Sequence, residues 1–272
     1  MTEAADRADL ADCHRLAAAA VTEARGVFLD HVGAAPALMK GKGDFATEAD
    51  LAIEALLRER LGGATGIPVY GEEGGGDFNA EACWVVDPID GTSNYSSGNP
   101  NCAILVSLIR GGQPVMAFTE MPLLNLSVSA VEGQPVVCNG TALPPLGSGG
   151  AGTHAAAQVG VGSVGSDDRV RFPASTRLAL IGELAKTELR PRISGSVGVD
   201  LAFVALGIYR AAVSFSPHVW DNAAGVLIAR SAGAAATDMD GRPWSPGSAG
   251  AIVGTPAAHE TALRTMLHVA NQ

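Results

Sequence analysis

The stretch from Trp84 to Thr92, WVVDPIDGT, is an apolar run that ends on two carboxylates. Asp87 and Asp90 stand three residues apart, and Pro88 between them stiffens the turn and removes a competing N–H group. Two nearby carboxylates repel each other and resist removal from water unless a positive group holds them. Either solvent around a strand-end turn or a bound metal ion could supply that stabilisation.

Further acidic residues follow or begin other expected elements. Glu72 and Glu73 come directly after a short apolar strand at 67–70, and Asp221 begins a helix in the motif WDNAAG at 220–225. Taken alone, the glutamate pair is typical of a solvated surface and Asp221 is typical of a helix N-cap. Hard cations such as Mg²⁺ prefer carboxylate, carbonyl and phosphate oxygens. If neighbouring strands bring these groups to one sheet edge, the pattern favours a metal site.

Four motifs together resemble the signature set of the inositol monophosphatase family. They are GDFATEAD at 43–50, GEE at 71–73, WVVDPIDGT and WDNAAG, and the resemblance covers nearly the whole chain. The run GIYRAAVSF at 207–215 resembles actinobacterial members. The resemblance implies an α/β (α+β) fold, a layered αβαβα sandwich of the inositol monophosphatase and fructose bisphosphatase type. It also implies that the chain is a Mg²⁺-dependent, lithium-sensitive phosphomonoesterase that forms a homodimer.

The resemblance also implies a set of metal ligands and two to three Mg²⁺ ions. The first ion would be held by Glu72, Asp87 and the carbonyl group of Ile89. The second would be held by Asp87, Asp90 and Asp221, so Asp87 would be shared. Glu72 would contribute to a third, looser ion near the loop at 40–44.

The same resemblance assigns a catalytic relay and a phosphate cradle. Asp50 and Thr92 would orient and deprotonate the attacking water, although Asp50 also fits the third position of a capping box that begins at Thr47. The backbone amides of Gly91 and Thr92 would hold a phosphate oxygen.

Substrate recognition is where the sequence departs from the family. The segment Gly195, Ser196 and Val197 would face the substrate with mainly backbone contacts. Ser214 stands seven residues before Asp221, where inositol-specific members carry a glutamate that binds a ring hydroxyl. We therefore expect weaker recognition of the substrate hydroxyl group, and Ser214→Glu should sharpen the preference for inositol 1-phosphate. Alternatively, Ser214 merely ends a strand, and His218 or a partner subunit supplies the contact.

Composition excludes several other classes of protein. The 272 residues carry a net charge of −10 with no basic block, which argues against nucleic-acid binding. Four widely spaced cysteines indicate reduced thiols, and the N-terminus has no apolar signal-peptide core. No run of 18 apolar residues predicts a membrane span. We expect a cytoplasmic protein whose partner is a small phosphomonoester.

The elements that must position these residues fall into two halves. Residues 1–143 form an N-terminal α+β half that carries most of the metal ligands. Apolar spacing predicts a helix over about 6–32, an exposed loop at 40–44, a helix from the capping box to Gly62, and an antiparallel sheet. The Gly- and Pro-rich run 144–152 is a joint between the halves.

Residues 153–272 form a C-terminal α/β half with the substrate-facing segment and the last metal aspartate. We expect strands at 155–161 and 211–215 and helices near 175–189, 198–206 and 221–232. The run 160–165 matches GxGxxG, but Pro173 delays the next helix, so a dinucleotide site is not expected.

These inferences predict a Mg²⁺-dependent phosphomonoesterase that hydrolyses inositol 1-phosphate and related small sugar or polyol phosphates with metal-activated water. Two alternatives stay open. The substrate could be fructose 1,6-bisphosphate or histidinol phosphate, or the chain could be a non-catalytic regulator that retains the fold. The presence of every expected ligand favours an enzyme over a regulator.

Overall fold

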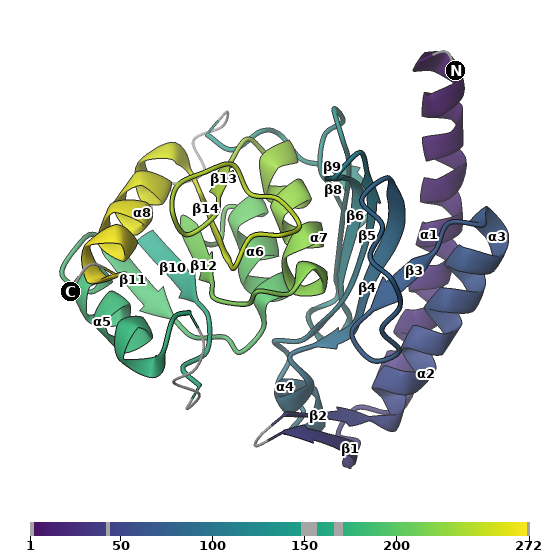
Figure 1. The fold of residues 1–272 in the computed structure, drawn as a ribbon, viewed down its shortest axis with the longest axis horizontal. Helices are drawn as coiled ribbons and strands as arrows, with labels where there is room; N and C mark the ends of the chain where they lie inside the picture. The colour runs from purple at the N-terminus through teal and green to yellow at the C-terminus, as the bar shows by residue number, and fades with distance from the viewer. Residues whose placement is uncertain (1–2, 42–43, 148–156, 166–170, 271–272) are drawn as a thin grey trace.

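The fold has five layers that alternate between helices and sheets, in a computed structural model that describes residues 3–41, 44–147, 157–165 and 171–270. In Figure 1 the layers run from α1 and α2 on the right to α5 and α8 on the left, with α6 and α7 between the two sheets. This arrangement confirms the predicted αβαβα sandwich.

The larger sheet has seven strands in the order β3-β4-β5-β6-β7-β8-β9. All neighbouring pairs are antiparallel except β3 and β4, which are parallel, so the predicted antiparallel sheet is confirmed apart from this edge. Consecutive strands joined by short turns produce this simple order. The strands are β3 Val69–Gly71, β4 Ala82–Asp90, β5 Ala103–Arg110, β6 Gln113–Met121, β7 Leu126–Val131, β8 Val137–Cys138 and β9 Thr141–Ala142.

Two helices cover the outer face of this sheet. Helix α1 (Glu3–Asp30) buries Ala17, Ala24 and Phe28 on one stripe, as its three- and four-residue spacing predicts. Helix α2 (Glu48–Leu57) begins at the predicted capping box and continues through a π-helical turn at Arg58–Gly62 into α3 (Gly63–Thr65). Gly66 ends this run in the left-handed conformation.

Two central helices separate the sheets. Helices α6 (Val197–Ala205) and α7 (Val219–Ser231) are buried on nearly all sides, because each packs against strands on two faces. Their sequences are accordingly apolar all round rather than striped. Asp221 is the third residue of α7 and His218 is its N-cap, so the alternative reading of Asp221 as the cap was wrong.

The smaller sheet has five strands in the order β11-β10-β12-β14-β13. Strand β10 is parallel to both β11 and β12, while β14 is antiparallel to β12 and β13. Helices α5 (Ala174–Leu184) and α8 (Pro256–Ala270) pack on its outer face. The strands are β10 Ala157–Val161, β11 Leu189–Arg192, β12 Ala211–Ser214, β13 Ala235–Thr237 and β14 Ala251–Gly254.

Two sequence-based element predictions were wrong. The segment predicted as a loop at 40–44 belongs to a β-hairpin of β1 (Pro36–Gly41) and β2 (Asp44–Thr47), with residues 42 and 43 outside the described range. The helix predicted over 175–189 ends at Leu184, and Leu189 instead begins β11. Both errors involve strands that only a pairing partner stabilises.

The two halves share their hydrophobic cores. One buried cluster joins Val85 of the larger sheet to Leu201 and Val226 of the central helices, and another joins Leu105 to Val199 and Leu227. The predicted division at 144–152 stays a prediction, since residues 148–152 lie outside the described part of the chain. None of the described helices is long and apolar enough to cross a membrane.

The GxGxxG run does not begin a helix. Gly160 and Val161 end β10, residues 162–165 have no regular structure, and the next described helix is α5. Gly160 is instead a close-packing position, because a Cβ atom there would lie 2.7 Å from the carboxyl carbon of Asp200.

Candidate active site

An irregular end of β4 places the two central aspartates. Asp87 pairs with Leu105 and Asp90 with Ala103, so one extra residue lies in β4 between these two pairs. This bulge accommodates Pro88, which cannot donate a ladder hydrogen bond. Beyond the strand, Gly91 adopts φ 85° and the short helix α4 (Thr92–Ser96) begins.

Asp87 lies at the centre of a group of like charges. Its side chain is 1% exposed, and its Oδ1 atom has no hydrogen-bond partner in the structure. Burial raises the pKa of Asp87 well above its usual range, and the neighbouring charges of Glu72, Asp90 and Asp221 raise it further. Removing water from such a group is unfavourable without a cation.

Asp90 binds the N-terminus of central helix α6. Its Oδ2 atom accepts hydrogen bonds from Ser196 Oγ and the Gly198 amide, both at 2.5 Å, and its Oδ1 accepts from the Val197 amide at 3.3 Å. These donors and the helix dipole favour a negative charge. Burial and the charge of Asp221 nevertheless raise the pKa of Asp90.

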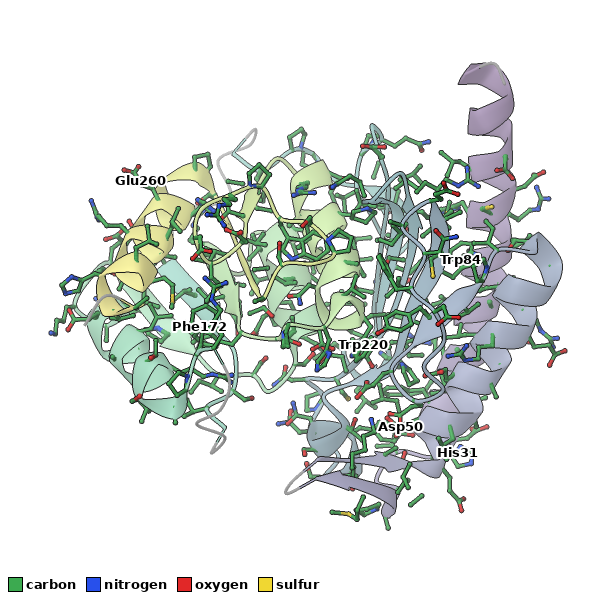
Figure 2. The ribbon with its side chains drawn as sticks, in the orientation of Figure 1. His31, Asp50, Trp84, Phe172, Trp220 and Glu260 are labelled. Carbon is green, nitrogen blue, oxygen red and sulfur yellow. The ribbon has the colours of Figure 1, made fainter. Side chains whose placement is uncertain are left out.

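Asp221 lies in the first turn of α7, and this helix contacts β4. Burial raises its pKa, while a hydrogen bond with Ser216 opposes that change. In Figure 2, Trp220, the neighbour of Asp221, lies in the lower central part of the molecule near the end of the larger sheet. The structure thus brings Asp87, Asp90 and Asp221 into mutual electrostatic contact, as the sequence pattern predicts.

Glu72 and Glu73 follow β3 at the same end of the sheet. The Glu72 amide donates to the Val86 carbonyl at 3.3 Å, because β3 runs parallel to β4. Lys40 Nζ of the hairpin lies 2.8 Å from Glu72 Oε1 and 2.5 Å from Glu73 Oε1. Burial raises the pKa of Glu73 to about 7, and its Oε2 atom has no hydrogen-bond partner.

Asp50 and Thr92 are in contact, as the proposed relay requires. Thr92 Oγ1 lies 3.3 Å from Asp50 Oδ1 and 3.0 Å from the Ile89 carbonyl oxygen, to either of which it can donate its proton. Asp50 is fully buried, and its Oδ2 accepts from the amide and hydroxyl groups of Thr47 at 2.7 and 2.5 Å. Asp50 therefore combines the capping contact with the contact to Thr92.

The predicted phosphate cradle and the predicted substrate-facing segment lie side by side. Asn94 Nδ2 donates to the Ser194 carbonyl at 2.8 Å and to the Asn101 carbonyl at 2.6 Å. A Cβ atom on Gly91 would lie 3.2 Å from the carbonyl oxygen of Gly195, and φ is 85°, so both the close approach and the backbone conformation favour glycine. Gly91 and Gly195 are thus adjacent although 104 positions separate them.

Ser214 is less accessible than a substrate-contacting residue. It is the last residue of β12, its side chain is 2% exposed, and its Oγ accepts from the Ser216 amide at 3.3 Å. These contacts agree with the alternative that Ser214 closes a strand end. Its substrate role, like those of Gly195 and Val197, stays a prediction.

The donor set fits hard divalent cations. Unpartnered buried oxygens on Asp87 and Glu73 and the crowding of four carboxylates are the features that a cation would relieve. Within the described residues, no group of three or more His, Cys, Asp or Glu side chains is already arranged as a metal-holding cluster. An Mg²⁺ site does not need such a preformed cluster, because Mg²⁺ usually keeps several waters and binds one or two carboxylates plus substrate oxygens.

Comparisons with known proteins decide the family. The model of the inositol monophosphatase family matches residues 9–270. Over 251 residues, the chain is 44% identical to a probable inositol 1-monophosphatase ImpA of Mycobacterium tuberculosis, covering 92% of each protein. It is 43% identical to the inositol-1-monophosphatase ImpA of Mycolicibacterium smegmatis over 84% of this chain and 82% of that one.

The chain belongs to the inositol monophosphatase family. As a member, it is a phosphatase, and its resemblance to actinobacterial members is confirmed by the two mycobacterial relatives. Among solved structures, an IMPase of Thermotoga maritima has a TM-score of 0.82 and 24% identity, covering 96% of this chain and 98% of that one. This likeness confirms the layered fold of the inositol monophosphatase family.

Sequence reasoning missed the contacts that surround the predicted ligands. Asn94 was not predicted at all, and its bond to the Ser194 carbonyl spans 100 positions. Ser196 was expected to face the substrate with mainly backbone contacts, whereas its Oγ donates to Asp90. The loop at 40–44 was expected near an ion at Glu72, but the contact of Lys40 with Glu72 was not predicted. The only signal in the sequence was the acidity of the ligand group, which demands some nearby cation or donor.

Proposed function

We propose that this chain is a Mg²⁺-dependent phosphomonoesterase that hydrolyses inositol 1-phosphate and related small polyol or sugar phosphates. The observation that carries the proposal is the group of like charges around Asp87, which lies beside the Asp50–Thr92 contact. A phosphomonoester is itself dianionic near neutral pH. Such a substrate can enter an acidic site only together with cations.

Each acidic residue has a defined part in this proposal. When bound, Mg²⁺ supplies an acidified water and charge stabilisation for the leaving oxygen. Two to three ions would be held by Glu72, Asp87, the Ile89 carbonyl, Asp90 and Asp221. Glu73 is a further candidate, because one of its buried oxygens has no partner.

The chain's own proton-handling group is the Asp50–Thr92 pair. Thr92 Oγ1 can pass its own proton to Asp50 Oδ1 while it takes a proton from the attacking water, so Asp50 ends as the proton acceptor. Thr47 fixes the other oxygen of Asp50, so the carboxylate keeps one orientation. The amides of Gly91 and Thr92 would hold a non-bridging phosphate oxygen and so orient the phosphorus toward that water.

Phosphate release from inositol 1-phosphate tests the proposal directly. Metal-free protein should release no phosphate in EDTA and should gain activity on titration with MgCl₂. Inorganic phosphate would be measured colorimetrically. Activity that persists unchanged in EDTA would exclude the metal role, and the absence of activity on any phosphomonoester would favour the non-catalytic regulator.

Substrate range needs a panel of phosphomonoesters. We propose a modest preference for inositol 1-phosphate over glycerol 2-phosphate, because the position of the family's hydroxyl-binding glutamate holds Ser214. A charge-assisted hydrogen bond contributes about 1.5–3 kcal/mol, and the buried Ser214 hydroxyl offers none. Catalytic efficiencies on these two, on fructose 1,6-bisphosphate and on histidinol phosphate would rank the candidates. A preference above about a hundredfold would mean that other residues build specificity.

Lithium sensitivity, assembly and location complete the proposal. Li⁺ would occupy the site of Asp87, Asp90 and Asp221 and inhibit uncompetitively, so a rate unaffected by millimolar LiCl at saturating Mg²⁺ would refute lithium sensitivity.

We also propose that the protein is a homodimer, which light scattering would test. A cytoplasmic location is supported by the four free cysteines.

A further inference from the structure

Glu54 contacts the loop that carries Glu72, although nothing in the sequence motifs marks it. It lies on α2, and its side chain is 2% exposed. Its Oε2 accepts the amide N–H of Glu73 at 2.7 Å, and its Oε1 accepts that of Gly74 at 2.7 Å. The two oxygens of one carboxylate thus hold two successive amides directly after Glu72.

Arg58, one turn further along the same helical run, holds the loop from its other side. Its Nε donates to Glu54 Oε1 at 2.8 Å. Its two terminal nitrogens donate to the Val69 carbonyl at 2.8 Å and the Gly75 carbonyl at 2.6 Å. The planar guanidinium therefore links the start and the end of the loop to Glu54 in one fixed geometry.

The loop is shaped around this carboxylate. A Cβ atom on Gly71 would lie 2.5 Å from Glu54 Oε1, and one on Gly74 would lie 2.7 Å from the same atom. Both distances are shorter than a Cβ contact, so any other residue at these positions would displace the Glu54 carboxylate, and glycine serves the contact with Glu54. The glycines that flank Glu72 and Glu73 are explained by a buried acid on another element.

We propose that Glu54 and Arg58 are positioning residues that fix Glu72 for metal binding, an inference that rests on the proposed function. The Glu72 amide is held by Val86, and the next two amides are held by Glu54. The backbone on both sides of the Glu72 side chain is therefore fixed, and that side chain has only to exchange its contact with Lys40 for the cation. Groups that orient metal ligands typically contribute 10- to 100-fold to metal affinity.

Glu54→Gln tests this role, because it keeps the shape of the side chain and removes one acceptor oxygen and the pairing with Arg58. Calorimetric titration of metal-free protein with MgCl₂ or MnCl₂ should show affinity weakened by about tenfold or more. In phosphate-release assays the Mg²⁺ concentration for half-maximal rate should rise equally, while kcat at saturating Mg²⁺ changes less than about threefold. The matched control is Glu59→Gln, which alters an exposed carboxylate on the same helical run.

Arg58→Lys provides the second variant. It keeps the charge but cannot hold Val69, Gly75 and Glu54 together, so it should weaken metal affinity in the same direction. Arg58→Lys tests the positioning role by itself if Glu54→Gln does not fold. Wild-type metal affinity in a folded variant would overturn the inference, even if activity fell. A wild-type protein that neither binds nor needs Mg²⁺ would overturn the proposed function and this inference together.

Discussion

Asp87 concentrates the chemistry of the site in one side chain. It is buried, one of its oxygens has no partner, and three other carboxylates raise its pKa. Asp87→Asn should lower phosphate release to less than about a tenth of wild type, since metal catalysis contributes several kcal/mol and each ~1.4 kcal/mol is tenfold. The variant should be as stable as wild type or more stable in EDTA, because it removes a repelling charge.

The control for this substitution is Asp12→Asn, which alters an exposed side chain of α1. It should change neither activity nor thermal stability appreciably. Phosphate release and thermal unfolding in EDTA would be measured on all three proteins. An Asp87→Asn variant that keeps most of its turnover would show that Asp87 is not a shared ligand.

Residue-level prediction worked where the signal was local. The capping box placed Asp50 and Thr47 correctly because both partners lie within four residues. The DPID segment, expected as a turn after the strand, is instead the bulged end of β4 and still keeps Asp87 and Asp90 close together. The family resemblance placed the loop at 40–44 near Glu72, but residue spacing could not predict the ion pairs of Lys40 with Glu72 and Glu73. They depend on how a hairpin folds over a distant sheet edge. The contacts of Glu54 with the loop could not be predicted for the same physical reason.

The N-terminus of α6 binds Asp90 of the larger sheet and so links the two halves. Ser196 caps this helix by accepting from the Val199 amide at 3.2 Å, and it also donates to Asp90. Ser196→Ala removes both bonds, and loss of a cap alone costs about 1 kcal/mol. We expect the free energy of unfolding in urea to fall by about 1–2 kcal/mol, with weaker Mg²⁺ binding.

Ser175→Ala is the matched control, because Ser175 lies exposed in the first turn of α5 and is not its cap. Its unfolding midpoint should stay near that of wild type. Equal midpoints for both variants would contradict the idea that the Ser196 contacts stabilise the junction.

Elements with strong periodicity were predictable, and those defined by pairing were not. Helix α1 and strands β4 to β7 carry an apolar pattern long enough to determine their type. Strand β1 of the hairpin is exposed along its whole length, so its residues indicate a loop until they pair with β2. Strand β11, Leu189–Arg192, has three polar or proline residues and exists because it lies parallel to β10.

At the scale of the whole molecule, the layers direct two helix N-termini toward the acidic site. Helices α6 and α7 lie between the sheets, and their first turns carry the contacts to Asp90 and the residue Asp221. Partial positive charge at both N-termini offsets part of the repulsion among the carboxylates. The family resemblance predicted the layers, but neither spacing nor composition indicated that both helix ends would meet at one place.

The acidic group also predicts how stability depends on pH without metal. Burial and like charges raise the pKa values of Asp87, Asp90 and Asp221 in the folded state above the usual value near 3.9. Between that value and the raised ones, the folded protein binds more protons than the unfolded chain. Its stability in EDTA should therefore fall as pH rises from about 5 to 8.

Mg²⁺ should remove most of this loss, because it replaces protons as the counter-charge at the site. At a hundred times its dissociation constant a ligand adds about 2.7 kcal/mol to the free energy of unfolding, so the midpoint of thermal unfolding should rise clearly at pH 8 and little at pH 5.

A smaller decline of stability with rising pH should remain in the presence of Mg²⁺. Burial raises the pKa of Asp200 to about 8, and this group is not among the proposed ligands. Asp200→Asn should reduce that remainder. Thermal unfolding across this pH range, with EDTA or Mg²⁺, measures both parts, and parallel curves under the two conditions would mean that the carboxylates do not form a metal site.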